Sequence, residues 1–160
     1  MKDGKKVTGK VQARAKAEYF CAYQERSQQE VRNKLYDLGL HSADVEELIS
    51  DLIQANFLNE ERFAISYTLG KFRIKHWGKY KIKQGLKLKQ VPPKLIEKAL
   101  KQIDGDEYLH TLKSLLQKKI LVLSEPVAYK LNYKLTQYAV TKGYERDLVA
   151  DLLKDPDWNS

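Results

Sequence analysis

Apolar residues recur at spacings of three and four along most of the chain, and this period predicts a series of amphipathic helices. In the stretch SQQEVRNKLYDLG, Ser27 is expected to cap a helix, Glu30 completes a capping box, and Gly39 ends the helix. Ser42 is expected to cap the next helix. The apolar face of that helix consists of Val45, Leu48, Ile49, Leu52 and Ile53.

A third capped helix is predicted over residues 59–76. Asn59 is its expected N-cap, and Phe63, Tyr67 and Ile74 are expected to face inward. Its acidic residues lie near the N-terminus and its basic residues near the C-terminus, as the helix dipole favours. The pattern also predicts helices over residues 13–24 and 105–123.

Residues 78–89 fit two structures. Basic and apolar residues alternate from Lys79 to Lys83, and the QG pair that follows is typical of a turn, so a basic hairpin is one interpretation. A helix would instead place Ile82 and Leu86 on one face. Gly85 counts against the helix, because glycine costs about 1 kcal/mol relative to alanine in a helix interior.

An internal repeat favours the helix at this position. Residues 30–49, 81–100 and 134–153 align with a period of about fifty residues. Since the first and third copies have the pattern of a helix–turn–helix, the second is expected to be one as well. The aligned apolar positions are Val31, Ile82 and Leu135; Leu35, Leu86 and Ala139; Leu40, Val91 and Tyr144; Val45, Ile96 and Val149; and Ile49, Leu100 and Leu153.

With one helix before each copy, the expected fold is all-α, with three tandem three-helix units forming an elongated, curved array. The expected boundaries are a flexible basic tail over residues 1–12 and units over 13–56, 57–103 and 104–160. A unit of this size buries little apolar surface by itself, so neighbouring units are expected to pack together.

Composition restricts the kinds of partner and the compartment that we expect for the protein. The net charge of +8 and the pI of about 9.4 favour an anionic partner. Cys21 is the only cysteine, so neither an intramolecular disulfide nor a thiolate metal cluster can form. Neither a secretory signal nor an apolar run long enough to span a membrane is visible, and we expect a soluble, cytoplasmic monomer.

The sequence carries no catalytic constellation. His41, His76 and His110 stand apart with no metal-ligand spacing, and the glycines form no phosphate loop. We therefore expect a protein that acts by binding, with no catalytic residues, metal or cofactor.

The most informative feature is a basic run without a carboxylate. On a helix, several of its side chains could neutralise phosphates together, and Trp77 and Tyr80 could stack on unpaired bases. A solvated face with aromatic residues anchoring a corner is the alternative. The predicted DNA or filament contacts are Lys71, Arg73, Lys75, Lys79, Lys81, Lys83, Lys87 and Lys89, with Arg26, Arg32 and Lys34 as a second set.

Two further surfaces could meet a partner. Between Lys34 and Arg62 the chain has no Lys or Arg, and this acidic stretch could orient the protein on a complementary partner or form ordinary polar helix faces. The tyrosines of the last unit could be core residues or a patch for a protein partner. They are Tyr129, Tyr133, Tyr138 and Tyr144.

Several motifs in order resemble the bacterial RecX family of recombination regulators. The first contains Arg26, Ser27, Glu30, Val31, Lys34 and Leu35; the second Leu58, Asn59, Glu60, Arg62, Phe63 and Ala64; the third Gly78, Ile82 and Leu86. The resemblance covers residues 13–100 well and the last unit loosely. Lys79 and Lys81 stand where relatives often have Arg, and Gln90 replaces a usual Gly, so bidentate contacts of Arg are not expected here.

The resemblance implies a non-enzymatic protein that binds the RecA recombinase and its filament on single-stranded DNA, with duplex DNA as a second candidate. It also implies inhibition of the recombinase, ATPase and co-protease activities. The alternative is a stand-alone helical DNA-binding protein that acts without RecA. A recognition helix would then offer Asn, Gln or Arg to base edges, whereas residues 78–89 offer mainly Lys.

Overall fold

The computed structural model describes residues 9–160, and these fold entirely into helices and connecting turns. The first unit contains α1 (Lys10–Tyr23), α2 (Gln28–Asp37) and α3 (Ser42–Gln54). The middle unit contains α4 (Glu60–Lys75), α5 (Lys79–Leu88) and α6 (Pro93–Leu100). The third unit contains α7 (Gly105–Val122), α8 (Ala128–Thr141) and α9 (Arg146–Lys154).

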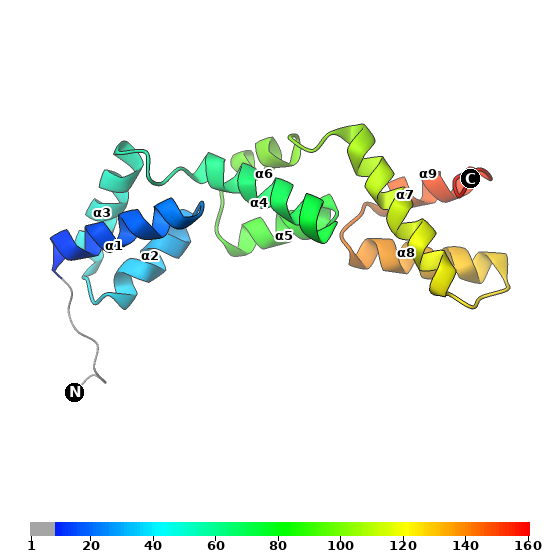
Figure 1. The fold of residues 1–160 in the computed structure, drawn as a ribbon, viewed down its shortest axis with the longest axis horizontal. Coiled ribbons are helices and arrows are strands. Elements are labelled where there is room, and N and C mark those ends of the chain that lie inside the picture. Colours follow the sequence, from blue (N-terminus) through cyan, green and yellow to red (C-terminus); the bar gives the residue numbers. More distant parts are fainter. Residues whose placement is uncertain (1–8) are drawn as a thin grey trace, which may run out of the picture.

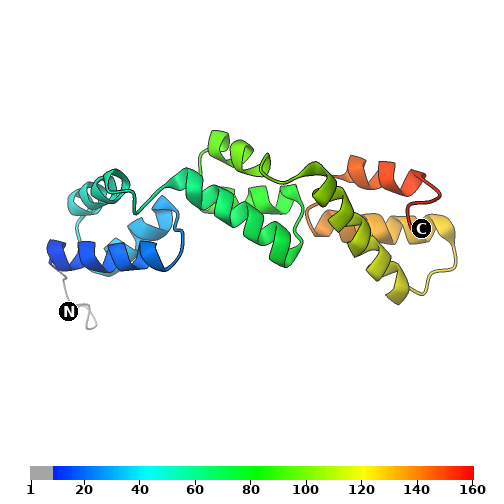
Figure 2. The ribbon, with the colours of Figure 1, turned by 45° about the horizontal axis from the view of Figure 1, so that its top comes forward.

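The three units follow one another along the long axis of an arched molecule (Figures 1 and 2). The all-α, elongated and curved array is thus confirmed. Of the expected tail, residues 1–8 lie outside the described residues, and α1 begins at Lys10, before the predicted start. At the start of α1, Lys10 and Arg14 reach carboxylates of α3, and Lys10 Nζ lies 2.5 Å from Glu47 Oε2.

Capping begins α2 and α4 as expected. Ser27 Oγ accepts a hydrogen bond from the Glu30 N–H, and the Glu30 carboxylate accepts one from the Ser27 N–H, which completes the capping box. Asn59 Oδ1 accepts from the Arg62 N–H. Ser42 does not cap α3, because extended backbone at His41 makes His41 the N-cap and Ser42 the first helical residue.

The inward face of α4 differs from the prediction at Ile74. Phe63 is buried and Tyr67 packs against the core, but Ile74 is 75% exposed and Phe72 is buried instead. At about 100° per residue, Ile74 lies roughly 200° around the helix from Phe72 and therefore faces solvent.

The middle unit contains a helix, not a hairpin, at residues 79–88. A Cβ at Gly85 would lie 2.0 Å from Tyr67 Oη, so the Tyr67 side chain would have to shift to admit it. The close packing of α5 on Tyr67 of α4 therefore suits the glycine that counted against a helix in the sequence.

The internal repeat defines the core. All aligned apolar positions are buried except Leu100 and Leu153, which are half-buried. The turn after the first helix of each copy also repeats. It takes a positive φ at Gly39 (90°), Gln90 (59°) and Gly143 (103°), so Gln90 adopts the left-handed conformation without glycine.

The middle and third units meet through their backbones. The Gly78 N–H donates to the Lys142 carbonyl oxygen at 2.8 Å, and the Tyr80 N–H donates to the Gly143 carbonyl oxygen at 2.9 Å. A Cβ on Gly78 would lie 2.3 Å from the Gly143 carbonyl carbon. Only glycine allows the two backbones to come this close. The two hydrogen bonds also satisfy N–H groups that would otherwise be free at the start of α5.

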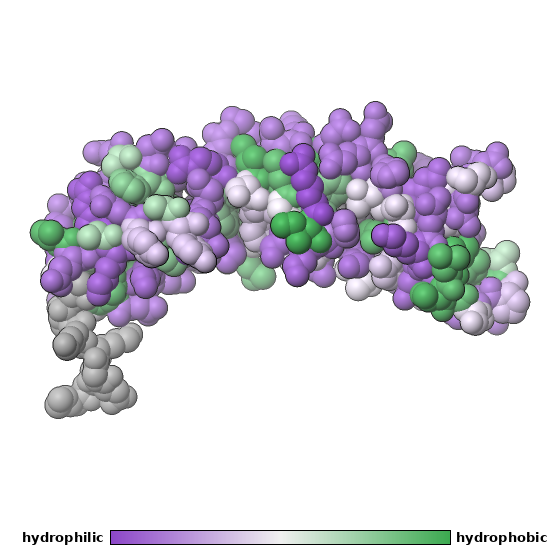
Figure 3. All heavy atoms as spheres, in the orientation of Figure 1, coloured by the Kyte–Doolittle hydropathy of each residue, from purple (hydrophilic) through white to green (hydrophobic). Residues whose placement is uncertain are grey.

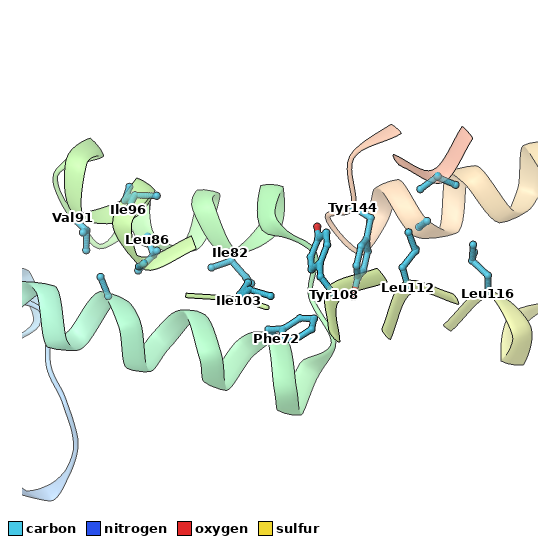
Figure 4. Close-up of a cluster of buried hydrophobic side chains, with 14 of the residues drawn as sticks. Phe72, Ile82, Leu86, Val91, Ile96, Ile103, Tyr108, Leu112, Leu116 and Tyr144 are labelled. Atoms are coloured by element: carbon cyan, nitrogen blue, oxygen red, sulfur yellow. The ribbon is translucent and has the colours of Figure 1, made fainter. Parts of the chain in front are cut away.

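Aromatic rings continue this junction into one core that extends through both units (Figure 4). The Tyr108 ring lies between Phe72 and Tyr144, with centroid distances of 5.7 and 5.0 Å. The Tyr108 hydroxyl accepts from the Lys79 N–H at 2.9 Å and donates to the Glu145 carboxylate. The Tyr144 hydroxyl donates to the His76 carbonyl oxygen at 2.9 Å.

The first unit has a separate core and joins the middle unit through polar contacts. Arg62 Nε donates to Glu25 Oε1 at 2.5 Å, and the Gln28 N–H donates to Glu60 Oε1 at 3.1 Å. Burial raises the pKa of Glu60 despite that hydrogen bond. Lys89 Nζ lies 3.4 Å from Glu30 Oε2. The two junctions therefore differ in chemistry.

Gly78→Ala tests the backbone junction. The added methyl group has to push the third unit away, and we expect the free energy of unfolding to fall by about 1–3 kcal/mol. Gly70→Ala is the matched control, since Gly70 lies within α4 and an added Cβ would meet open space there; we expect it to be neutral or stabilising by about 0.4–1 kcal/mol. Urea denaturation followed by circular dichroism measures both, and equal stabilities of the two variants would contradict the junction.

Tyr108→Phe tests the same junction through pH. Burial and the Glu145 hydrogen bond raise the pKa of Tyr108, and burial raises that of Tyr144. The folded protein therefore keeps protons that the unfolded chain loses near pH 10, so the free energy of unfolding is retained below about pH 10 and falls above it. Tyr108→Phe should cost about 1–3 kcal/mol at neutral pH and make the alkaline loss shallower.

Urea denaturation between pH 7 and 11 measures both effects. Tyr129→Phe, at a ring that is 72% exposed, is the control. If Tyr108→Phe and Tyr129→Phe gave the same profile, the buried hydroxyl would have no role in holding the units together.

Candidate nucleic-acid interface

The predicted basic residues of α5 point in two directions. The exposed crest of the helix carries Tyr80, Lys83, Gln84, Lys87 and Leu88. Lys81 lies on the side of α4, and Lys83 and Lys87 lie on the side of α6. The basic run therefore forms separate groups of cations instead of one continuous face.

The first group is the Trp77 cluster, defined as Lys71, Trp77 and Lys81. Lys71 Nζ lies 5.0 Å and Lys81 Nζ 4.7 Å from the Trp77 ring, and Lys71 Nζ is also 5.4 Å from the Tyr67 ring. These are cation–π distances. The turn between α4 and α5 thus brings together two cations that are ten positions apart in the sequence.

The two residues expected to stack on bases differ in access. Trp77 is half-buried and packs against the core of the middle and third units. Tyr80 is 57% exposed on the crest of α5. The Trp77 ring contributes to the corner between the helices as well as to the cation cluster, and its stacking on bases stays a prediction.

The second group lies in a shallow pocket of about 280 Å³ between α5 and α6. Lys83 and Lys87 line one side, and Pro93 and Leu100 are among the apolar residues of the other. Both lysines are exposed. Glu97 also lines this pocket and lowers its positive potential.

The remaining predicted cations of the run point toward other units or toward solvent. Arg73 Nε lies 3.5 Å from Glu107 Oε1, and Lys79 Nζ lies 5.0 Å from the Tyr108 ring, both on the side of the third unit. Lys89 reaches Glu30 of the first unit. Lys75 is exposed at the end of α4.

The second predicted set lies in the first unit and has two kinds of contact. Arg32 forms a two-pronged ion pair with Glu46, with distances of 2.8 and 2.9 Å, and these hydrogen bonds lower the pKa of Glu46. Arg26 and Lys34 instead approach the Phe20 ring, at 3.7 and 5.6 Å from its centroid. Arg26 and Lys34 line a groove together with Tyr19 and Tyr23, two residues that the sequence pattern alone did not single out.

The acidic stretch is partly neutralised by cations that are distant in the sequence. Lys10 lies near Asp44 and Glu47, and Arg14 Nη1 lies 3.7 Å from Asp51 Oδ2. Lys98 pairs with Glu61. The pattern of charges along the chain therefore overstates the negative charge of this surface.

Of the four tyrosines of the last unit, two are buried or half-buried and two are exposed. Tyr144 is buried and Tyr138 is half-buried, while Tyr129 and Tyr133 are 72% and 64% exposed. Figure 3 shows apolar side chains gathered where α7 leads into α8. Leu121 and Val122, which are 84% and 72% exposed, lie at this end of α7.

Residues 9–160 give no support for a metal site, a reactive cysteine or a membrane-spanning helix. Among them, no group of three or more His, Cys, Asp or Glu side chains could hold a metal ion. His76 and His110 line the same small pocket although they are far apart in the sequence. Cys21 is buried, and burial raises the pKa of its thiol, which opposes nucleophilic reactivity. None of the described helices is long and apolar enough to cross a bilayer.

Comparisons with known proteins agree with the motifs. Residues 13–52 match the family model of the first RecX three-helix domain, and residues 59–100 match that of the second. The chain is 31% identical over 131 residues to a regulatory protein RecX of Clostridium perfringens, covering 81% of this chain and 61% of that protein. It is 26% identical over 136 residues to the RecX protein of Bacillus mycoides, covering 85% and 50%.

A solved structure shares the fold along nearly the whole chain. The crystal structure of RecX from Lactobacillus salivarius superposes with a TM-score of 0.85 at 24% identity, covering 92% of this chain and 96% of that one. The chain spans between half and about 61% of the curated relatives named above. With two matching domain models and the same three-unit fold, this chain belongs to the RecX family of regulatory proteins.

Proposed function

We propose that this protein binds the RecA recombinase filament on single-stranded DNA and lowers its ATPase, strand-exchange and co-protease activities. The observation that carries the proposal is membership of a family whose curated members are named regulatory protein RecX. Because the chain spans only part of the length of those relatives, the proposal concerns the three helical units alone.

The shape of the molecule supports binding along a filament. The three units form one arched row, and the middle and third units share a continuous core. A row of helical units offers a long surface that can follow a groove. A shared core keeps the middle and third units in a constant orientation, which reduces the entropy lost on binding.

The charge of the middle unit supports contact with phosphate. Lys71 and Lys81 of the Trp77 cluster, and Lys83 and Lys87 beside α6, supply cations on both flanks of α5. Each contact with a phosphate releases a counterion, so binding is expected to weaken steeply as salt is raised. Binding alone then accounts for regulation, without a catalytic step, in the cytoplasm where RecA acts.

A stand-alone helical DNA-binding protein is less well supported. Reading base edges requires a recognition helix with side chains such as Asn, Gln or Arg on its exposed face. The exposed crest of α5 carries Tyr80, Lys83, Gln84, Lys87 and Leu88, so Gln84 is its only side chain of that kind. Such a helix suits contact with a backbone better than recognition of a sequence.

The test is the ATPase activity of RecA on single-stranded DNA with increasing amounts of this protein. We expect progressive inhibition. The double variant Lys83→Ala/Lys87→Ala should need about fivefold more protein for half-inhibition, if each contact contributes about 0.5 kcal/mol. Its binding to the filament should also depend less on salt, by about 0.7 in the logarithmic slope for each lost phosphate contact.

Arg146→Ala/Lys154→Ala is the control, since it removes two exposed cations from α9. We expect it to inhibit like the unmodified protein. No inhibition at large excess of protein would contradict the function. Equal losses in both double variants would instead contradict the assignment of Lys83 and Lys87, and a footprint on duplex DNA without RecA would favour the stand-alone alternative.

A further inference from the structure

A groove on the first unit has a chemical character that differs from the rest of the surface. It lies between α1, the turn after it and α2, and has a volume of about 550 Å³. Figure 1 shows these elements at the N-terminal end of the array, away from the third unit. The α1 groove, as we name it, is lined by Lys16, Tyr19, Phe20, Tyr23, Arg26 and Lys34.

Two of its aromatic rings are open to solvent. Tyr19 and Tyr23 are 74% and 73% exposed, so neither contributes to the core of the first unit. They lie four residues apart on α1, which places them on successive turns of one helix face, with Cβ atoms about 5–6 Å apart. The two rings therefore offer neighbouring flat surfaces.

The side chain of Arg26, in the turn after α1, is held beside these aromatic rings. Its Nε donates to the Phe20 carbonyl oxygen at 2.9 Å, and its guanidinium carbon lies 3.7 Å from the Phe20 ring and 6.0 Å from the Tyr23 ring. Its Nη atoms donate to no acceptor among residues 9–160. A guanidinium whose orientation is fixed and whose outer donors are free is suited to a phosphate.

The charge of the groove has one sign. Lys16, Arg26 and Lys34 line it together with uncharged residues. Of the carboxylates close to these cations in sequence, Glu18 pairs with Arg14 at 3.2 Å, Glu25 with Arg62 at 2.5 Å and Glu30 with Lys89 at 3.4 Å. None of the three cations forms an ion pair with another described residue.

We propose that the α1 groove binds single-stranded nucleic acid without help from RecA. Unpaired bases stack on Tyr19 and Tyr23, and phosphates contact Lys16, Arg26 and Lys34. A single strand combines flat apolar faces with regularly spaced anions, as this surface requires. An acidic peptide supplies the anions without the flat faces, and duplex DNA keeps its bases inside the stack. The site goes beyond the proposed function because it lies in another unit from the middle-unit lysines and needs no filament.

The test is fluorescence anisotropy of a labelled oligothymidine added to the full chain. Tyr19→Leu/Tyr23→Leu keeps an apolar surface and removes the rings, and affinity should fall on the order of tenfold or more. Tyr19→Phe/Tyr23→Phe keeps the rings and should bind like the unmodified protein. Both variants change exposed side chains, and circular dichroism checks that they fold.

Tyr129→Leu/Tyr133→Leu is the matched control, because these tyrosines are similarly exposed on the third unit. It should retain full affinity. A separate variant, Lys16→Ala/Lys34→Ala, should lower the salt dependence by about 0.7 in the logarithmic slope for each lost phosphate contact. Inhibition of RecA is a separate readout, so loss of oligothymidine binding alone leaves the proposed function intact.

Three results would overturn the assignment. The first is equal affinity of the Leu variant and the unmodified protein for oligothymidine. The second is an equal loss in the control variant. The third is binding of an acidic peptide, such as polyglutamate, that depends on Tyr19 and Tyr23 while oligothymidine does not bind.

Discussion

The close backbone contact between Gly78 and Gly143 is the constraint on which the arrangement of the molecule depends. It occurs where α5 begins, and hydrogen bonds from Gly78 and Tyr80 to the third unit satisfy groups that no side chain of α5 caps. Tyr108 adds a further acceptor for the Lys79 N–H. The start of the most basic helix is therefore held by a unit that follows it in the chain. Any displacement of the third unit would also move the lysines of α5.

The junction with the first unit is of another kind. There, ion pairs and a hydrogen bond link two separate hydrophobic cores, whereas the middle and third units share one core. Partly exposed ion pairs contribute little stability and weaken as salt is raised. The first unit can thus change its orientation at a smaller free-energy cost than the third. The third unit is fixed by a shared core, whereas the first unit is joined by polar contacts. A change in the orientation of the first unit could therefore place the α1 groove and the middle-unit lysines on the same strand.

Much of the fold could be predicted because its signals are local. The capping box at Ser27, the cap at Asn59 and the repeated apolar positions each depend on residues close in sequence. The sequence was less informative where tertiary contacts decide. The repeat predicted the helix over residues 78–89 correctly although Gly85 counted against it, and the packing of Gly85 against Tyr67 became visible only in the structure. Ile74 was wrongly predicted to face inward in place of Phe72, because only the packed face of α4 distinguishes them.

The candidate sites were harder to predict than the fold. The lysine run was visible, but its division into two flanks depends on how α4 and α6 pack around α5. Pairing of α1 cations with α3 carboxylates joins residues more than thirty positions apart, so the charge pattern could not reveal it. The α1 groove was not predicted, because the sequence alone does not show that Tyr19 and Tyr23 lie beside Arg26 and Lys34. Their spacing of four was the available signal.

The central claim is that the cations of the middle unit contact a polyanionic assembly. The most direct measurement is the rate of lysine acetylation, residue by residue, with and without RecA filaments on single-stranded DNA. The account predicts that Lys71, Lys81, Lys83 and Lys87 become protected, while Lys154 on α9 reacts at an unchanged rate. Unchanged acetylation of the four middle-unit lysines when the protein is bound to the filament would contradict it.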